Sequence, residues 1–149
     1  MFINLQRMNK IRFLYSIVLL SFLGFAQQKS ADSLMQVLGK TKNDIDKTNL
    51  LNAISDSYKV VDPKKMFVFG NQALDLAKKI NYTIAQGNAY LNLGNSKIIE
   101  GDYKAAINYF QQAQEIFENE NPTPNTKDEI ASGLAKSYGS IGIVLSEQS

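Results

Sequence analysis

The side chains that most often carry catalysis and metal binding are missing from this chain. Its 149 residues contain no His and no Cys. Zinc sites built from these residues, and nucleophilic arrangements of the Ser/His/Asp or Cys/His kind, are therefore excluded. Without Cys there is also no disulfide framework.

A polar run in the first part of the chain has the spacing of a calcium loop but lacks two of its essential residues. Asp44, Asp46 and Thr48 match the first ligand positions. Asn49 stands where such a loop turns on a glycine, and Ser55 stands where it requires a bidentate Glu. We therefore expect no metal ion at this segment.

The remaining candidates for chemistry are a glycine–lysine segment and a group of glutamates. The segment from Gly94 to Lys97 lacks the spacing of a phosphate-binding loop and falls inside a predicted helix. Glu115, Glu118 and Glu120 could pair as acids for hydrolysis, but carboxylates on an amphipathic helix near a loop are usually just solvated. We predict a chain without catalysis, metal ion or cofactor in these residues.

The formal net charge of +2 comes from the N-terminal segment. Arg7, Lys10 and Arg12 lie in the first 26 residues, which contain no acidic residue. The rest of the chain has 13 Lys, 14 acidic residues and no Arg. A nucleic-acid surface needs clustered Arg and Lys, so we expect no nucleic-acid partner.

The same segment has the composition of an export signal. Its basic residues precede an apolar run of 13 residues that ends at Ala26, before the polar Gln27. A membrane-spanning helix needs ~20 apolar residues. We expect a signal peptide at 1–26, cleavage between Ala26 and Gln27, and a periplasmic or extracellular location. An uncleaved anchor is the alternative, and membrane contact is expected only through this segment or a helix beyond residue 149.

Apolar residues after residue 29 recur at spacings of three and four, and no alternating run is long enough for a strand. This periodicity predicts an all-α fold. Asp62 before Pro63, and Gly101 before Asp102, mark helix starts. Two pairs have the spacing of a capping box: Thr83 with Gln86, and Thr126 with Glu129. The predicted helices cover residues 31–39, 46–60, 63–80, 84–99, 103–119 and 127–147.

Two of these helices carry small and large residues at positions suited to close antiparallel packing. The short turn at residues 100–102 forces the two helices to run antiparallel. Backbones can meet where residues are small, while larger side chains fill the space around the crossing. The small residues are Gly94, Ala106 and Ala113, and the large ones are Tyr90, Leu93 and Phe110.

The segment AYLNLGNSKIIEGDYKAAINYFQQAQEIF, residues 89–117, closely resembles a tetratricopeptide repeat. It departs from that family at Lys97, in the usual Tyr position, and at Glu118, in the usual closing Pro position. Lys97 is expected to lay its stem on the apolar surface. A degenerate copy of the pattern precedes it, and a third begins with Tyr138 and Gly142.

The resemblance implies a right-handed superhelix of antiparallel helix pairs, an α-solenoid of about two and a half repeats. Its parts are an N-terminal helix and connector at 27–46, repeats at 47–80 and 83–118, and the first helix of a truncated repeat at 127–149. Because the third repeat lacks its second helix, we expect a natural chain that continues, or a fragment.

The resemblance also implies a concave groove, lined by the first helix of each pair, in which a protein or peptide segment docks. Asn side chains suit such a groove because each carries a donor and an acceptor for a peptide backbone. A clamp for a terminal carboxylate is not supported, because Arg is absent. The candidate groove residues are Asn49, Asn52, Asp56, Lys59, Asn88, Leu91, Asn95, Ile98, Lys136, Gly139, Ile143 and Ser146.

Two functions remain open at this point. The first is a non-catalytic scaffold that binds a protein or peptide in the groove. The second, implied by resemblance to exported tetratricopeptide arrays, is the sensor region of a membrane-anchored signalling protein. Its output domain, a histidine kinase, nucleotide cyclase or transcriptional regulator, would then lie beyond residue 149.

Overall fold

A computed structural model describes residues 30–148 of the chain, and these residues are α-helical with connecting turns and without β-strands. The predicted signal peptide and its cleavage site between Ala26 and Gln27 lie outside them. Residues 30–38 are helical. The helices that follow are α2 (Asp44–Ser57), α3 (Pro63–Lys79), α4 (Thr83–Ile99), α5 (Tyr103–Asn119) and α6 (Lys127–Glu147).

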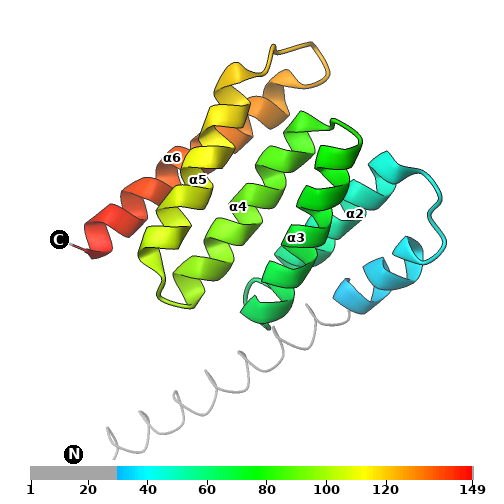
Figure 1. Cartoon of the computed structure of the whole chain (residues 1–149), viewed down its shortest axis with the longest axis horizontal. Helices are drawn as coiled ribbons and strands as arrows, with labels where there is room; N and C mark the ends of the chain where they lie inside the picture. The colour runs from blue at the N-terminus through cyan, green and yellow to red at the C-terminus, as the bar shows by residue number, and fades with distance from the viewer. Residues whose placement is uncertain (1–29, 149) are drawn as a thin grey trace, which may run out of the picture.

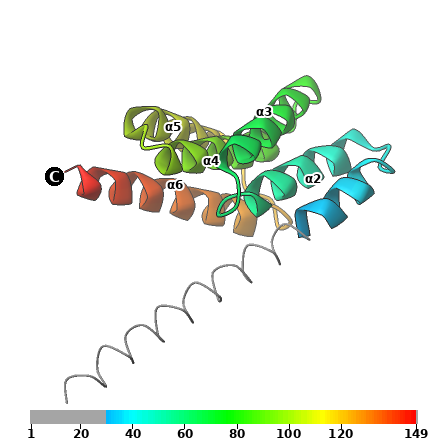
Figure 2. The same cartoon turned by 90° about the horizontal axis from the view of Figure 1, so that it is seen from below.

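The five helices from α2 to α6 form two layers. Consecutive helices run antiparallel and pack against each other, as Figure 1 shows. Helices α2, α4 and α6 also contact one another in sequence and form one layer, while α3 and α5 form the other (Figure 2). The layer of α2, α4 and α6 is called the inner layer below, and that of α3 and α5 the outer layer.

Two of the predicted helix starts have the expected caps. The Asp62 carboxylate accepts a hydrogen bond from the Lys65 amide at 3.1 Å, directly before Pro63 at the start of α3. Asp102 accepts from the Ala105 amide at 3.1 Å at the start of α5. Gly101 adopts a φ of 78°, which favours glycine and ends α4 sharply.

Helix α2 begins and ends earlier than the sequence predicts. Its start is fixed by Asn43, whose side chain accepts hydrogen bonds from the Ile45 amide at 2.8 Å and the Asp46 amide at 3.2 Å. At its other end the chain turns at Tyr58, where the Asp62 amide donates to the Tyr58 carbonyl at 2.9 Å. The other predicted helices match the observed ones within one residue at each described end.

Neither predicted capping box forms. Thr83 is already the first residue of α4, after Tyr82, and its hydroxyl donates to the Glu120 carboxylate at 2.6 Å instead of capping the helix. Thr126 does precede α6 but turns back to accept from the Thr123 amide at 2.9 Å. In both cases a partner outside the helix takes the hydroxyl.

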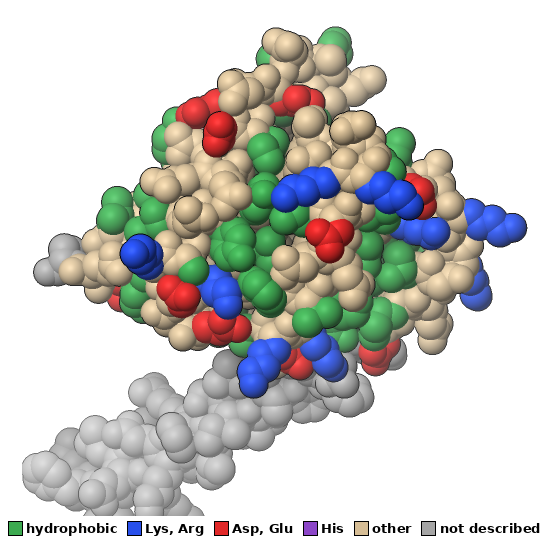
Figure 3. Space-filling model, viewed as in Figure 1, with side chains coloured by type: hydrophobic (Ala, Val, Ile, Leu, Met, Phe, Trp, Pro, Cys, Tyr) green, Lys and Arg blue, Asp and Glu red, His purple; other side chains and the backbone are tan. Residues whose placement is uncertain are grey.

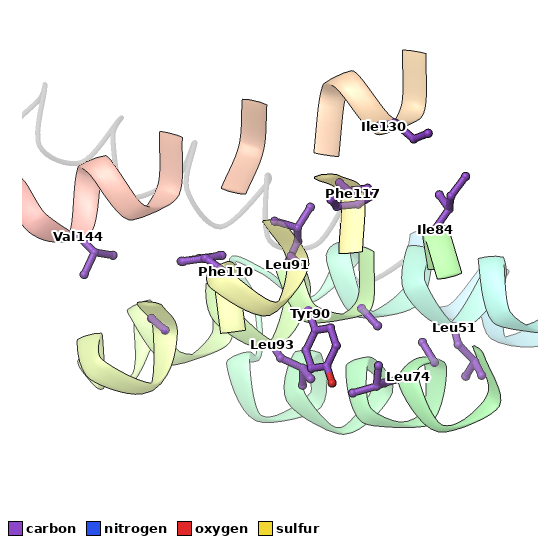
Figure 4. Close-up of a cluster of buried hydrophobic side chains, with 14 residues drawn as sticks. Leu51, Leu74, Ile84, Tyr90, Leu91, Leu93, Phe110, Phe117, Ile130 and Val144 are labelled. Atoms are coloured by element: carbon purple, nitrogen blue, oxygen red, sulfur yellow. The ribbon is translucent and has the colours of Figure 1, made fainter. Parts of the chain in front are cut away.

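Glycines face aromatic rings where α5 packs between α4 and α6. A Cβ atom on Gly94 would lie 2.5 Å from the Phe110 ring, so the ring packs directly on the helix backbone. The ring of Phe117 occupies the space next to both Gly87 of α4 and Gly133 of α6. These rings belong to the buried cluster of Figure 4, to which each of α2–α6 contributes.

Gly142, which the sequence pattern aligned with Gly94, lies at no such crossing. A Cβ atom on Gly142 would meet open space. The glycine of α6 that receives an aromatic ring is Gly133, nine residues earlier. The pattern failed here because Phe117, near the end of α5, reaches the first half of α6.

Lys97 lies on an aromatic ring, as its position in the repeat pattern suggested. Its ammonium group is 4.3 Å from the centroid of the Phe67 ring of α3. It also forms an ion pair with Glu100 at 2.7 Å, and this hydrogen bond raises the pKa of Lys97 above its ordinary value. Among residues 30–148, no helix is both long and apolar enough to cross a membrane.

Candidate binding groove

The inner layer contains a groove with a volume of about 400 Å³. Its walls are α2 and α6, and α4 forms its floor, so the groove combines residues distant in the sequence. The residues that line it are Asn52, Asp56, Lys59, Asn88, Leu91, Asn92, Asn95, Glu129, Ser132, Lys136 and Ser140. We call this hollow the inner groove.

Two buried asparagines join α2 to α4 beneath the inner groove. The Asn52 amide donates to the Ala85 carbonyl at 3.0 Å, and the Asn92 amide donates to the Asn52 carbonyl at 3.0 Å. Asn52 is 9% exposed and Asn92 is 7% exposed. Because an unpaired buried carbonyl is costly, these amides have a structural role in holding the two helices together.

A third asparagine joins α4 to α6. The Asn88 amide donates to the Glu129 carboxylate at 2.8 Å, which is a charge-assisted hydrogen bond. Glu129 was expected to cap its own helix but reaches across to the neighbouring one. This bond sets Asn88 and Glu129 at the same level of the two helices.

The polar side chains at the other end of the inner groove are available to a ligand. Asn95 and Lys136 lie seven residues, or about two helical turns, beyond Asn88 and Glu129. Within residues 30–148, the side chains of Asp56, Lys59, Asn95 and Lys136 form no hydrogen bond or ion pair with protein groups. This end therefore offers two ammonium groups, one carboxylate and one amide.

Leu91 supplies an apolar part of the floor. It is 5% exposed and belongs to the main hydrophobic cluster, yet it also lines the groove. An extended segment in the groove would thus meet an apolar surface at the centre and polar groups along both walls.

Most of the residues predicted for the groove lie together there, and the others do not. Asn49 is exposed outside it, and Ile98 packs against the hydrophobic cluster. Ile143, 60% exposed, also lies outside the groove. Gly139 and Ser146 are likewise not among the lining residues. These five positions are corrected by the structure.

The error on α6 is one of rotation about the helix axis. The residues of α6 that line the groove are Glu129, Ser132, Lys136 and Ser140, spaced by three or four. Packing of Phe117 against Gly133 turns this set toward α4. The sequence analysis aligned α6 on Gly142 and so missed Glu129, Ser132 and Ser140, as well as Asn92 on α4; alignment on Gly133 would have found the set.

The repeat signature residues occupy the helix interfaces. Ala106, Phe110 and Ala113 are fully buried on α5, Leu93 is fully buried on α4, and Tyr90 is 9% exposed. None of them lines the inner groove. Within residues 30–148, no group of three His, Cys, Asp or Glu side chains is placed to hold a metal ion.

Comparison of the chain with models of known protein families, with curated proteins and with solved structures finds no match.

Proposed function

We propose that this chain is a non-catalytic interaction module that holds a segment of a protein or peptide in its inner groove. In this proposal the two helix layers are part of a right-handed α-solenoid of the tetratricopeptide type. Export across the inner membrane, directed by the first 26 residues, is part of the same proposal.

The observation that carries the proposal is the set of unsatisfied polar side chains at one end of the inner groove. Asp56 and Lys59 come from one wall, Lys136 from the other, and Asn95 from the floor. The asparagines at the opposite end are already bonded to protein groups. An extended segment can bond to Asn95 through its backbone and to the lysines through acidic side chains or carbonyls.

The length of the groove supports a peptide rather than a small molecule. The lining residues of α6 run from Glu129 to Ser140, which is about three helical turns or ~16 Å along the axis. About five residues of an extended chain cover that distance.

Site-specific crosslinking tests the proposal on the full chain in its native host. A photoreactive amino acid in place of Asn95 should capture a partner, and peptide mapping of the crosslink should identify one segment. A photoreactive residue in place of Asp75, exposed on α3 in the outer layer, is the matched control. Equal capture of the same partner from both positions would contradict binding in the inner groove.

The identified segment then allows a quantitative test. A synthetic peptide of that sequence should bind the wild-type chain, and Asn95→Ala and Lys136→Ala should each weaken it about 5- to 10-fold in calorimetric titration. Asn49→Ala, exposed outside the groove, should leave the affinity unchanged. Unchanged affinity in both groove variants would rule out the proposed site.

Export is tested separately by the N-terminus of the protein recovered from the host. We expect mature protein that begins at Gln27. An intact N-terminus on protein in the cytoplasmic fraction would contradict export without affecting the proposed groove.

A further inference from the structure

A second hollow, on the outer side of the molecule, combines a buried phenol with carboxylates. Its volume is about 480 Å³, and it lies between the first half of α4 and the last half of α5. We call it the outer pocket. Its lining residues are Thr83, Tyr90, Gln112, Glu115, Ile116, Asn119 and Glu120. The inner groove and the outer pocket share no residue.

Tyr90 is a buried polar side chain whose hydroxyl has no protein partner. The residue is 9% exposed, and within residues 30–148 its hydroxyl forms no hydrogen bond. Figure 4 shows the hydroxyl pointing away from Phe117 and Ile84, to the side where Leu74 of α3 lies. Buried tyrosine hydroxyls are normally paired, so this one calls for a partner from outside the chain.

The electrostatic character of the outer pocket is negative. Within the described residues the Glu115 carboxylate forms no hydrogen bond or ion pair. Glu120 accepts from the Thr83 hydroxyl and keeps its charge. The last turn of α5 carries no basic residue, so the negative end of its helix dipole adds to the two carboxylates.

The aromatic ring at the floor is compatible with a positive charge nearby. Lys78 of α3 already holds its ammonium group 5.4 Å from the centroid of the Tyr90 ring. The ring of Tyr109 lies 6.2 Å from that of Tyr90, which extends the aromatic surface. Figure 3 looks onto α3 and α5 and shows hydrophobic side chains in the strip between them, with charged groups along its margins.

We propose that the outer pocket binds an organic cation, an alkylguanidinium or alkylammonium group. The cation pairs with Glu115 and Glu120, its alkyl part lies against Ile116 and the Tyr90 ring, and the Tyr90 hydroxyl accepts a hydrogen bond from the cation. The group can belong to a free amine or to a Lys or Arg side chain of a partner protein. This inference does not depend on the function proposed for the inner groove.

The test is a titration of the ¹⁵N-labelled full chain with agmatine, followed by NMR. Agmatine should shift the backbone amides of Thr83, Ile116 and Asn119 in a saturable way, and 1-butylurea, of similar size but neutral, should not. Glu115→Gln should weaken binding at least 5-fold, and Tyr90→Phe about 2- to 3-fold. The latter variant removes no hydrogen bond within the described protein, so it should fold normally.

Two further variants make the result specific. Asp128→Asn removes an exposed carboxylate at the start of α6 and should leave agmatine binding unchanged. Lys78→Met removes the cation that lies near the Tyr90 ring and should tighten binding about 2-fold or more. Equal effects of Asp128→Asn and Glu115→Gln, or equal shifts with 1-butylurea, would overturn the proposal.

A second titration distinguishes the source of the cation. An acetylated and amidated Gly-Arg-Gly peptide carries the same guanidinium group on a peptide backbone. Binding at least as tight as that of agmatine assigns the pocket to a partner's side chain, and binding of agmatine alone assigns it to a free amine. Binding of neither probe overturns the proposal.

Discussion

The asparagines of the inner groove differ in what their amides bind. Asn52 and Asn92 are buried and hold α2 against α4, whereas Asn95 has no protein partner within the described residues. The sequence analysis gave Asn52 and Asn95 the same ligand-binding role, because both lie on the expected face. Burial and distance to a neighbouring carbonyl separate them, and neither quantity can be read from residue type and spacing.

This division predicts unequal effects of alanine substitutions on stability. Asn92→Ala should lower the free energy of unfolding by about 1–3 kcal/mol, because it leaves the buried Asn52 carbonyl without that donor. Asn49→Ala, at an exposed position of the preceding helix, should change it by less than about 0.5 kcal/mol. Urea unfolding followed by circular dichroism measures both, and equal losses would contradict a structural role for Asn92.

A hydrogen bond between α5 and α6 involves two groups that titrate. The Tyr138 hydroxyl donates to the Glu118 carboxylate at 2.5 Å. This bond lowers the pKa of Glu118 below its ordinary value of 4.5 and raises the pKa of Tyr138 above its ordinary value of 10.0. Both side chains are exposed, so the contribution is small in salt.

The two shifts define the pH window in which the bond stabilises the fold. The contribution of Glu118 is present above pH 4.5 and is lost as the pH falls through its lowered pKa. The contribution of Tyr138 is present below pH 10.0 and is lost as the pH rises through its raised pKa. Tyr138→Phe should therefore melt at a lower temperature than wild type near pH 7, with a smaller difference at pH 3 and pH 11. A difference that stays constant over this range would contradict the assignment.

At the scale of helices, aromatic rings on glycines set how closely the helices approach. Phe117, 1% exposed, fills the space between Gly87 of α4 and Gly133 of α6. Those two helices carry the floor and one wall of the inner groove, so this ring determines how they are spaced and rotated. The groove thus depends on a side chain that does not line it.

Two glycines of α6 provide a matched pair for testing this packing. A Cβ atom on Gly133 would overlap the Phe117 ring, which has no free space to move into, so Gly133→Ala should lower the free energy of unfolding by about 1–3 kcal/mol. Gly142→Ala should raise it by up to about 1 kcal/mol, because its Cβ meets open space and alanine favours the helix. Chemical denaturation measures both, and a stabilising Gly133→Ala would refute the packing argument.

Helix positions were predictable from the sequence where the chain itself marks them. Pro63 and Gly101 restrict the backbone locally, and the starts of α3 and α5 follow from them. The capping boxes at Thr83 and Thr126 were wrong because each hydroxyl had a competing partner, Glu120 or the Thr123 amide. The rotation of α6 was missed because it depends on contact with Phe117, a tertiary interaction.

At the scale of the whole molecule, the helices differ in how many neighbours cover them. Helix α4 packs against α2, α3, α5 and α6, and ten of its residues are buried. Helix α6 packs against α4 and α5, and four of its 21 residues are buried. Large apolar side chains of α6 remain exposed: Tyr138, Ile143 and Leu145 are each more than half accessible. Local stability should therefore fall from the centre of the array toward α6.

Native-state hydrogen exchange measures this gradient directly. We expect the slowest amide exchange in the middle of α4, around Leu91 to Leu93, where opening disrupts contacts with every neighbouring helix. Amides near Val144 should exchange at least 10-fold faster, because their helix opens by breaking contacts with α5 and α4 alone. The agmatine-binding condition is an internal control, since a ligand at Glu115 and Tyr90 should slow exchange in α4 and α5 more than in the last turns of α6. Uniform protection from α2 to α6 would instead require that the five helices unfold only as one unit.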